Sequence, residues 1–543
     1  MNSLVEILCT RAVELPERDA YTFLVDGETD AIKLTYRELD QKARSIAAQL
    51  ETVCERGARA LLLFPPGLDY IAAFCGCLYA GVVAVPAYPP RMNRNLQRLQ
   101  AIVADSDAAV ALTTTATLAR IKPSLAQQQG LENLRWLETD NIGDRTVTWR
   151  MPDINRETLA LLQYTSGSTA TPKGVMVTHG NLLHNESMIQ RAFRQTSDSI
   201  IVGWLPLYHD MGLIGTVLQP LFTGSRCVMM SHVAFLQRPV RWLEAISRHR
   251  ATTSGAPNFG YELCTRKITA EECESLDLSS WTTAFNGSEP VRADTLEQFS
   301  KTFASCGFQA SAFYPCYGLA EATLFVSGSP EPRVPHVKTF AAEALEQNRV
   351  IEAGDAEARR LVSCGSTTSD QQVIIVNPET RHVCSTNEVG EIWVAGESVT
   401  AGYWKRPEET EETFGARPAN GSGSFLRTGD LGFIHEHELF ITGRLKDLII
   451  IRGRNLYPHD IERTVQESHP RLRSAAGAVF SIANGEERLV VVHEAERSAK
   501  FNYAEILSTI REVVAEEYEV QVYAVVIVKT GGVPRTSSGK IQR

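Results

Sequence analysis

A segment rich in glycine and hydroxyl residues, 164–174 (YTSGSTATPKG), has the residue types that bind polyanions. Small residues let backbone N–H groups approach an anion closely, and the serine and threonine hydroxyls together with Lys173 would complement a polyphosphate. The segment is not a Walker A loop, because that pattern needs Gly-Lys-Ser/Thr, whereas Pro172 precedes Lys173 and Gly174 follows it. A flexible linker is the plainer alternative, but apolar runs flank the segment on both sides, which favours a binding loop.

The elements that must position this loop follow an alternating pattern. Short apolar, β-branched runs such as 60–64, 110–113 and 228–230 alternate with amphipathic stretches such as 35–51 and 239–249. This alternation predicts an α/β fold whose sheets are covered by helices. The first amphipathic stretch opens with Thr35 and Glu38, which form a capping-box pattern.

An uncharged run, 71–88, is as long as a membrane span. Its small residues favour close packing within a protein instead. We predict a buried helix that stops at Gly81, followed by a short strand, 82–85, that ends at Pro86.

The composition excludes several classes of protein. The chain has 543 residues, enough for several domains, and 54 basic against 64 acidic side chains give a net charge of −10. An acidic chain has no long-range attraction for nucleic acid, so we expect no nucleic-acid partner. Because the run 71–88 is interpreted as buried core, we also expect no integral membrane association. The 11 scattered cysteines include no CxxC pair, which argues against a zinc site and a disulfide framework and indicates a reducing cytoplasm. Glu6 and Arg11 come too early for the core of a signal peptide.

After Arg444 the pattern of apolar and polar residues changes to that of a compact C-terminal tail with its own strands and helix. We place a boundary there, between a large N-terminal domain, 1–445, and a small α+β C-terminal domain, 446–543. In the tail we expect strands at 479–482, 488–493 and 520–528 and a helix at 503–517.

Segment 164–174 closely resembles the phosphate-binding loop of the adenylate-forming (AMP-binding) superfamily, although Ala170 stands where glycine is commonest. Further segments typical of that superfamily follow in its order: 204–215 (WLPLYHDMGLIG), 286–290 (NGSEP), 317–324 (YGLAEATL), 427–430 (RTGD), 443–453 (GRLKDLIIIRG) and 534–540 (PRTSSGK). The resemblance spans nearly the whole chain. It implies a large domain of parallel-sheet subdomains plus a distorted β-barrel, and a small C-terminal domain that moves.

The resemblance also implies roles for single residues. Glu321 would hold Mg²⁺, His209 would line the carboxylate pocket and move during the cycle, and Lys540 would bridge the substrate carboxylate and the α-phosphate. Lys446 takes the hinge position. The residues implied to bind ATP are Thr165, Ser166, Gly167, Ser168, Thr169 and Lys173 in the loop, Asn286, Gly287, Ser288, Glu289, Tyr317 and Gly318 around adenine, and Asp430 and Arg444 at the ribose.

Each of these residues has an ordinary alternative when it is taken alone. His209 could be a buried core histidine, Glu321 could begin a helix, and Asp430 could be a turn aspartate. Lys540 could be a solvated surface lysine. Their occurrence in ordered segments favours the functional interpretation.

The implied reaction joins a carboxylate to the α-phosphorus of ATP and expels pyrophosphate. Two anions must meet, so positive charge and positioning should dominate catalysis. No general base is needed, because the carboxylate is already ionised at neutral pH.

Three features resemble the fatty acyl-AMP ligase branch of the superfamily. The segment 204–215 lacks the FDxS-like motif of amino-acid-activating domains, and 84–90 (AVPAYPP) is typical of fatty acyl-AMP ligases, as is Ala320. The third feature is an insertion at about 335–360 with a helix-like stretch, 339–348. In that family the insertion restricts the tail and disfavours CoA; a neutral surface insertion is the alternative.

The sequence therefore predicts an enzyme that uses ATP and Mg²⁺ to activate a medium- or long-chain fatty acid. The acyl group would pass to the phosphopantetheine of an acyl carrier protein, free or fused, in polyketide, lipopeptide or lipid biosynthesis. One alternative is a fatty acyl-CoA synthetase that uses free CoA. Another is a non-catalytic nucleotide- or acyl-binding module. Acyl-CoA formation would identify the first, and the absence of fatty-acid-dependent pyrophosphate exchange the second.

Overall fold

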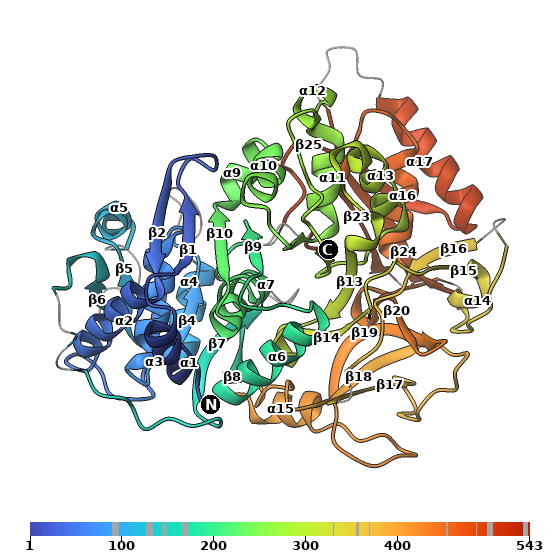
Figure 1. The fold of residues 1–543 in the computed structure, drawn as a ribbon. Coiled ribbons are helices and arrows are strands. Elements are labelled where there is room, and N and C mark those ends of the chain that lie inside the picture. Colours follow the sequence, from blue (N-terminus) through green and yellow to red (C-terminus); the bar gives the residue numbers. More distant parts are fainter. Residues whose placement is uncertain are drawn as a thin grey trace.

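A computed structural model gives the fold (Figure 1). It describes residues 1–89, 97–125, 134–143, 146, 149–165, 172–329, 331–354, 358–368, 370–451, 454–484, 486–496, 503–535 and 541–543. A large part built around two mainly parallel sheets is joined by an antiparallel sheet, and the C-terminal segment forms a smaller unit beside them (Figure 1). The mixed α/β class expected from the alternating pattern is confirmed.

The first sheet has six strands in the order β6-β5-β3-β4-β7-β8 and is parallel except for the antiparallel β7–β8 pair. Its strands are β3 (Arg59–Leu63), β4 (Val83–Ala87), β5 (Ala108–Thr113), β6 (Arg135–Glu138), β7 (Leu159–Thr165) and β8 (Lys173–Thr178). The helices along this part of the chain are α2 (Tyr36–Leu50), α3 (Leu68–Tyr79), α4 (Gln97–Ser106) and α5 (Thr115–Leu125). All five residues of β4 are buried, as expected for a strand covered on both faces.

The second sheet has eight strands in the order β14-β13-β12-β11-β9-β10-β1-β2, parallel in its interior and antiparallel at both edges. Its strands are β1 (Asp19–Leu24), β2 (Ala31–Thr35), β9 (Ile200–Gly203), β10 (Arg226–Met230), β11 (Thr253–Ala256), β12 (Thr283–Asn286), β13 (Phe313–Gly318) and β14 (Phe325–Gly328). Because β12 and β13 are parallel neighbours, Asn286 and Gly318 both lie at the carboxyl edge, where open α/β sheets bind ligands.

Helices surround these two sheets. They are α1 (Leu4–Glu14), α6 (His179–Ala192), α7 (Asp210–Leu213), α8 (Gln219–Thr223), α9 (His232–Gln237), α10 (Val240–His249), α11 (Asn258–Lys267), α12 (Ala270–Cys273) and α13 (Ala293–Phe303). The capping box predicted for α2 is present: the Thr35 hydroxyl accepts from the Glu38 amide, and the Glu38 carboxylate accepts from the Thr35 amide.

The region expected to form a distorted barrel consists of a four-stranded antiparallel sheet and a two-stranded ribbon. The sheet contains β17 (Gln371–Val376), β18 (Gly390–Gly396), β19 (Leu426–His435) and β20 (Glu438–Arg444). The ribbon contains β15 (Val337–Ala341) and β16 (Ala358–Val362), with α14 (Ala342–Glu346) between them; α15 (Pro407–Phe414) lies between β18 and β19. A bridge between Ser363 and Phe440 joins the ribbon to the sheet.

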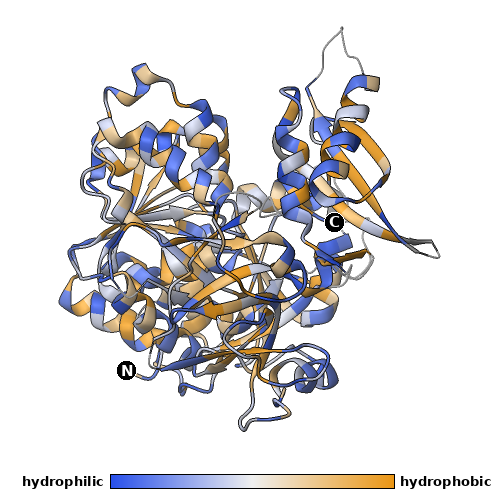
Figure 2. Ribbon diagram, turned by 90° about the vertical axis from the view of Figure 1, so that its right-hand side faces the viewer, coloured by the Kyte–Doolittle hydropathy of each residue, from blue (hydrophilic) through white to orange (hydrophobic). Residues whose placement is uncertain are grey.

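The C-terminal unit is α+β, as predicted. It contains β21 (Ile449–Ile451), β22 (Arg454–Leu456), α16 (Pro458–Glu467), β23 (Leu472–Asn484), β24 (Glu486–Ala495), α17 (Tyr503–Tyr518) and β25 (Val522–Lys529). Its three-stranded sheet, β23-β24-β25, is drawn mostly in the hydrophobic colour in Figure 2, and Leu489 and Val491 of β24 share a core with Ile510 of α17.

Two sequence predictions were wrong in detail. Pro86 does not end the strand after Gly81, because β4 continues to Ala87 and Pro86 pairs with Leu62. On the other side only Ala84 pairs with β7, so the missing N–H of Pro86 removes no ladder bond there. Stretch 339–348 is not one helix: its first three residues belong to β15, because β16 supplies an antiparallel partner, and the helix α14 is short.

Among the described residues, no helix combines the length and the apolar character that crossing a bilayer requires. The run 71–88 is instead divided between α3 and β4, whose side chains are buried.

Candidate active site

The ends of β12 and β13 form one wall of the candidate site. Asn286 ends β12 and is fully buried, yet neither its amide nitrogen nor its amide oxygen has a hydrogen-bond partner among the described residues. Gly287 follows at a close approach, since a Cβ there would lie 3.0 Å from the carbonyl oxygen of Cys316. Ser288 turns the chain with a φ of 72°. A buried amide without partners at a sheet edge is suited to a ligand that both donates and accepts hydrogen bonds.

Tyr317, Asp430 and Arg444 form a hydrogen-bonded group beside this wall. The Tyr317 hydroxyl donates to Asp430 Oδ2 over 2.8 Å, and Arg444 Nε donates to Oδ1 over 2.9 Å. Asp430 and Arg444 are register partners on β19 and β20, which fixes the ion pair. Gly318 must be glycine here, because a Cβ would lie 1.8 Å from the Leu324 carbonyl oxygen. Both oxygens of Asp430 therefore have protein partners.

Glu321 lies in a short 3₁₀ turn, Ala320–Ala322, just after β13. The Tyr403 hydroxyl donates to its Oε1 over 3.0 Å, and its backbone carbonyl accepts from the Thr400 amide over 3.0 Å. Burial raises the pKa of the Glu321 carboxyl. A carboxylate held in such surroundings favours a nearby cation.

Thr165 and Lys173 frame the predicted phosphate-binding loop, because they pair across the end of the β7–β8 hairpin. Ser166, Gly167, Ser168 and Thr169 lie outside the described residues. The Lys173 ammonium forms an ion pair with Glu409 of α15, and it stands 4.9 Å from the centre of the Tyr403 ring. Lys173 and Glu321 therefore contact the same tyrosine.

Tyr403 belongs to a strap, residues 400–404, that lies along β8. Backbone hydrogen bonds fasten it there: Met176 N to Gly402 O (2.9 Å), Ala401 N to Met176 O (3.1 Å) and Trp404 N to Gly174 O (2.8 Å). Sequence reasoning missed Tyr403 and Glu409. The only sequence signal was a Gly-Tyr-Trp triplet, and their contacts with Lys173 and Glu321 depend on tertiary structure.

His209 stands at the N-terminus of α7, half-buried, with its ring centroid 4.8 Å from that of Tyr208. Tyr208 in turn packs edge-on against Tyr88. A π-helical turn, Ile214–Leu218, follows α7, a feature that is frequent at functional sites. His209 is therefore part of an aromatic wall.

Glu289 has a structural contact at this edge. Its Oε1 accepts from the backbone amide of Phe259 over 2.8 Å, at the first turn of α11. A carboxylate at a helix N-terminus is stabilised by the unpaired amides. The adenine role expected for Glu289 stays a prediction.

Lys446 lies in a 3₁₀ turn, Leu445–Asp447, between β20 and β21. Burial, and then the Arg444 charge, lower the pKa of the Lys446 ammonium. Lys540 lies outside the described residues. Among the described residues before and after it, Arg535 pairs with Ile541, and Arg543 forms ion pairs with Asp447 (3.6 Å) and Glu462 (2.6 Å). The chain end beyond Lys540 therefore lies next to the turn that holds Lys446.

Residues of the predicted insertion contact the C-terminal unit. Arg454 Nε forms an ion pair with Glu346 at 2.6 Å, and Asn455 Nδ2 donates to Asn348 Oδ1 over 3.1 Å. Arg359 of β16 is buried and pairs through Nε with Asp460 at 3.1 Å. The insertion therefore joins the two parts of the molecule at several points.

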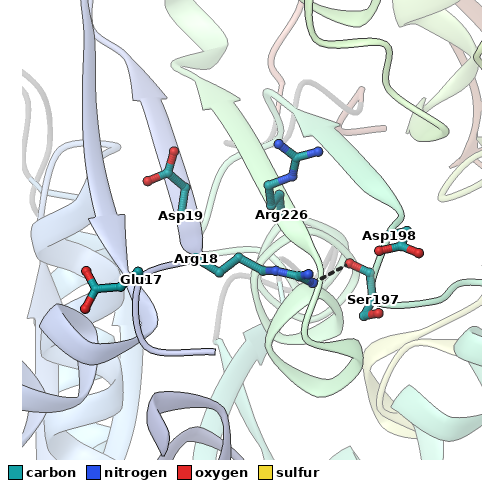
Figure 3. A pocket seen from close by; sticks show the side chains of 6 residues that line it. All are labelled: Glu17, Arg18, Asp19, Ser197, Asp198 and Arg226. Atoms are coloured by element: carbon teal, nitrogen blue, oxygen red, sulfur yellow. Dashed lines mark hydrogen bonds between the residues drawn. The ribbon is translucent and has the colours of Figure 1, made fainter. Parts of the chain in front are cut away.

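A cavity and a cluster of charged side chains lie outside this site. A cavity of about 380 Å³ is lined by Glu17, Arg18, Asp19, Ser197, Asp198 and Arg226 (Figure 3). The cavity lies where β1 and β10 begin, at the amino edge of the second sheet, whereas Asn286 lies at the carboxyl edge. Arg18 Nη1 donates to the carbonyl oxygens of Ser197 (2.8 Å) and Gly224 (3.0 Å).

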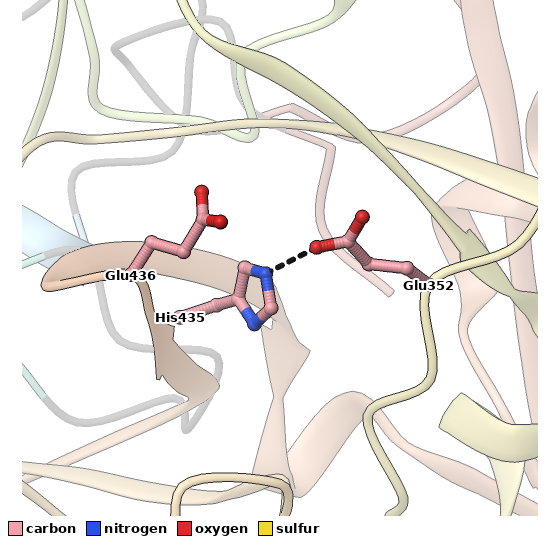
Figure 4. A group of neighbouring side chains, drawn as sticks. All are labelled: Glu352, His435 and Glu436. Carbon is pink, nitrogen blue, oxygen red and sulfur yellow. Dashed lines mark hydrogen bonds and ion pairs between the residues drawn. The ribbon is translucent and has the colours of Figure 1, made fainter.

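The cluster contains Glu352, His435 and Glu436 (Figure 4). Lys338 Nζ lies 3.1 Å from a carboxylate oxygen of each glutamate, and His435 Nε2 lies 2.6 Å from Glu352. The Lys338 ammonium already pairs with both carboxylates, so this group is an ion-pair cluster that fastens the insertion to the end of β19.

Two family models and several relatives match the chain over nearly its whole length. The AMP-binding enzyme family model matches residues 9–404, and the model of the Disco-interacting protein 2-like AMP domain matches residues 446–543. The chain is 51% identical to the medium-chain-fatty-acid–[acyl-carrier-protein] ligase JamA of Moorena producens, over 100% of this chain and 94% of the relative. The ligase of the same kind named TtuA, from Teredinibacter turnerae, is 37% identical, over 100% of this chain and 92% of the relative.

A similar solved structure is the fatty acyl-adenylate ligase of Legionella pneumophila in complex with acyl adenylate and pyrophosphate. It is 42% identical, has a TM-score of 0.81, and the match covers 99% of this chain and 94% of that chain.

Proposed function

The chain belongs to the AMP-binding, adenylate-forming enzyme family, and from that premise we propose that it is a fatty acyl-AMP ligase. It joins a medium- or long-chain fatty acid to ATP, giving acyl-AMP and pyrophosphate. It then transfers the acyl group to the phosphopantetheine thiol of an acyl carrier protein. The extended similarity to a relative named medium-chain-fatty-acid–[acyl-carrier-protein] ligase supports both the substrate and the partner.

One observation carries this proposal most directly. The Tyr403 side chain donates to Glu321 and lies under the Lys173 ammonium, so the expected metal ligand and the expected phosphate-binding lysine are neighbours. A cation site and an ammonium group beside each other are what a departing pyrophosphate requires.

The adenosine moiety of ATP fits the wall formed by β12 and β13. The adenine base offers both donors and acceptors, which matches the unpaired amide of Asn286. The ribose would lie at Asp430, whose oxygens now accept from Tyr317 and Arg444. Ribose hydroxyls would share these oxygens, since each carboxylate oxygen accepts more than one hydrogen bond.

Glu321 fits a magnesium ion. Its carboxylate is a hard oxygen ligand in surroundings that raise its pKa, so a divalent cation would stabilise the ionised form. When bound, Mg²⁺ would neutralise phosphate oxygens of ATP. Tyr403 would keep the Glu321 carboxylate in place for it.

In the first half-reaction a carboxylate oxygen of the fatty acid attacks the α-phosphorus of ATP. The bond between the α-phosphorus and the bridging oxygen breaks, and pyrophosphate leaves with that electron pair. Lys540 would hold the carboxylate and the α-phosphate together, and Lys173 would bind the leaving pyrophosphate. His209 would act as a wall of the carboxylate pocket, with no proton to transfer.

The second half-reaction is expected to use a carrier protein rather than free CoA. Contacts of the insertion with the C-terminal unit, through Glu346, Asn348 and Arg359, support a restrained tail whose hinge is Lys446. The acidic chain, with its 11 scattered cysteines, is expected in the cytoplasm.

The test is pyrophosphate exchange into ATP over a series of fatty acids of increasing chain length, with direct detection of the acyl adenylate. We expect pyrophosphate exchange only when a fatty acid is present. We also expect an acyl adenylate whose mass corresponds to the fatty acid supplied. Binding of ATP without any exchange would mean a non-catalytic nucleotide-binding module.

A further inference from the structure

The ammonium of Lys173 already has an anionic partner in the protein, the carboxylate of Glu409. Glu409 lies in the first turn of α15, and the two side chains form an ion pair. The other described neighbour of the ammonium is the Tyr403 ring. Among the described residues, the charged partner of Lys173 is therefore an anion that the protein itself supplies.

Glu409 is held in this position from its other side. Arg406 Nη1 donates to Glu409 Oε1 over 3.1 Å, while its Nη2 donates to Asp105 Oδ1 over 3.1 Å. Asp105 also accepts from the hydroxyl of Tyr164, on the strand that leads into the loop. Lys173 and then Arg406 lower the pKa of the Glu409 carboxyl, so it is an anion at neutral pH. The pair is thus a carboxylate shared between two cations.

Solvent reaches both side chains of the pair. The exposed fractions are 32% for the Lys173 side chain and 38% for that of Glu409, so water can solvate the carboxylate as soon as it leaves. The backbone of Lys173 is held in place, because the residue pairs with Thr165 and the strap 400–404 is bound to β8. Glu409 keeps Arg406 as a partner when it swings away.

We propose that Glu409 is a competing anion for Lys173: it yields the ammonium to the departing pyrophosphate and returns to it, which weakens pyrophosphate binding and speeds product release. This proposal rests on the proposed function, since Lys173 must first be a pyrophosphate ligand. Glu409 is then a positioning residue that acts through Lys173. An exposed ion pair contributes little energy, so the effect is modest, about two- to five-fold in affinity.

Direct binding of magnesium pyrophosphate to the full chain tests this by titration calorimetry and stopped-flow release. Glu409→Gln should bind pyrophosphate about two- to five-fold more tightly and release it more slowly than the wild type. The control is Glu412→Gln, on the same helix, which removes one negative charge from an exposed side chain and should leave the affinity unchanged. Unchanged or weaker binding by Glu409→Gln overturns the proposal.

A double variant separates competition for Lys173 from a general change of charge. In the Lys173→Gln background, Glu409→Gln should no longer tighten binding. A gain that persists there overturns the proposal. Misfolding cannot imitate the expected result, because a damaged site loses affinity instead of gaining it. Failure of the proposed function looks different: the wild type itself would then neither bind pyrophosphate nor catalyse exchange.

Discussion

Asn286 is a buried amide without partners among the described residues, and this makes its role separable from stability. Asn286→Leu should raise the Kd for ATP about 3- to 10-fold, since each lost hydrogen bond contributes about 0.5–1.5 kcal/mol. The thermal unfolding midpoint should stay equal or rise, because an unsatisfied buried amide costs about 1–3 kcal/mol. Calorimetry with ATP and a melting curve measure both.

Asn258 provides the matched control for that variant. It is also buried, but its amide donates to Glu262 (2.8 Å) and Thr295 (2.9 Å). Asn258→Leu should therefore lower the melting temperature. Equal destabilisation by both substitutions would contradict the interpretation of Asn286 as a ligand-binding group.

Tyr403→Phe removes the donor to Glu321 and leaves the ring beneath Lys173. We expect the Mg²⁺ concentration for half-maximal adenylate formation to rise several-fold, because one hydrogen bond to a charged group is lost. The rate of adenylate formation at saturating Mg²⁺ should change little. Tyr164→Phe is the control, because that hydroxyl bonds to Asp105 instead. A loss that saturating Mg²⁺ does not restore would argue against a positioning role.

Lys540→Ala should lower the rate of adenylate formation by about 10²–10³, because a donor aimed at developing negative charge is lost. The Kd for ATP should be nearly unchanged. Single-turnover formation of acyl-AMP, measured beside ATP binding, checks both. Near wild-type adenylation would refute the role that the family resemblance gives to Lys540.

For single residues, the sequence predicted the functional role of those that lie within recognised motifs. Asn286, Tyr317, Asp430 and Arg444 gather at one edge because strand order brings their motifs together. Tyr403 and Glu409 could not be predicted, since Tyr403 and Glu321 are 82 positions apart and neither residue belongs to a recognised pattern.

At the scale of elements, the insertion shows why periodicity alone was insufficient. Stretch 339–348 reads as a helix, but β15 takes its first residues because β16 offers backbone partners. Strands depend on a partner from elsewhere in the chain, whereas helices depend on local bonds. This is why helices α2 and α10 agreed closely with expectation.

The insertion should restrain the C-terminal unit through Glu346. Glu346→Gln removes its ion pair with Arg454, so the tail should move more freely and acyl-CoA formation from free CoA should rise. Deleting the insertion should raise it further. Glu343→Gln, an exposed residue of the same helix, is the control. Mass spectrometry of the products measures the amount of acyl-CoA formed. If neither Glu346→Gln nor the deletion forms acyl-CoA, the insertion does not restrain the C-terminal unit.

His459 at the start of α16 makes this junction dependent on pH. Burial lowers its pKa to about 3, and its Nε2 lies 2.5 Å from Arg359 Nη2. The folded state therefore prefers neutral imidazole: its contribution is complete above the unfolded pKa of about 6.5 and is lost as the pH falls towards 3.

Wild type should thus lose stability between pH 6.5 and 5 more steeply than His459→Gln, by up to about 1 kcal/mol per pH unit. The difference between their chemical unfolding curves at several pH values isolates this contribution from that of the carboxylates. Parallel curves would show that His459 is not held neutral.

For the whole molecule, the alternating pattern predicted covered parallel sheets, and the resemblance implied a separate tail. Neither the pattern nor the resemblance predicted how the C-terminal unit packs against the insertion. That placement depends on side chains far apart in the sequence, such as Arg454 with Glu346 and Arg359 with Asp460. It places Arg543 beside Asp447, within the turn that holds the expected hinge residue, Lys446.

A fatty acyl-AMP ligase differs from an acyl-CoA synthetase in the thiol that receives the acyl group after adenylation. The most direct measurement supplies the enzyme with ATP, Mg²⁺, a medium-chain fatty acid, and equal amounts of free CoA and a phosphopantetheinylated acyl carrier protein. Mass spectrometry then follows acyl-AMP, acyl-CoA and the acylated carrier protein. A fatty acyl-AMP ligase should give acyl-AMP and acylated carrier protein with little acyl-CoA. Predominant acyl-CoA, or no acyl-AMP at all, would contradict it.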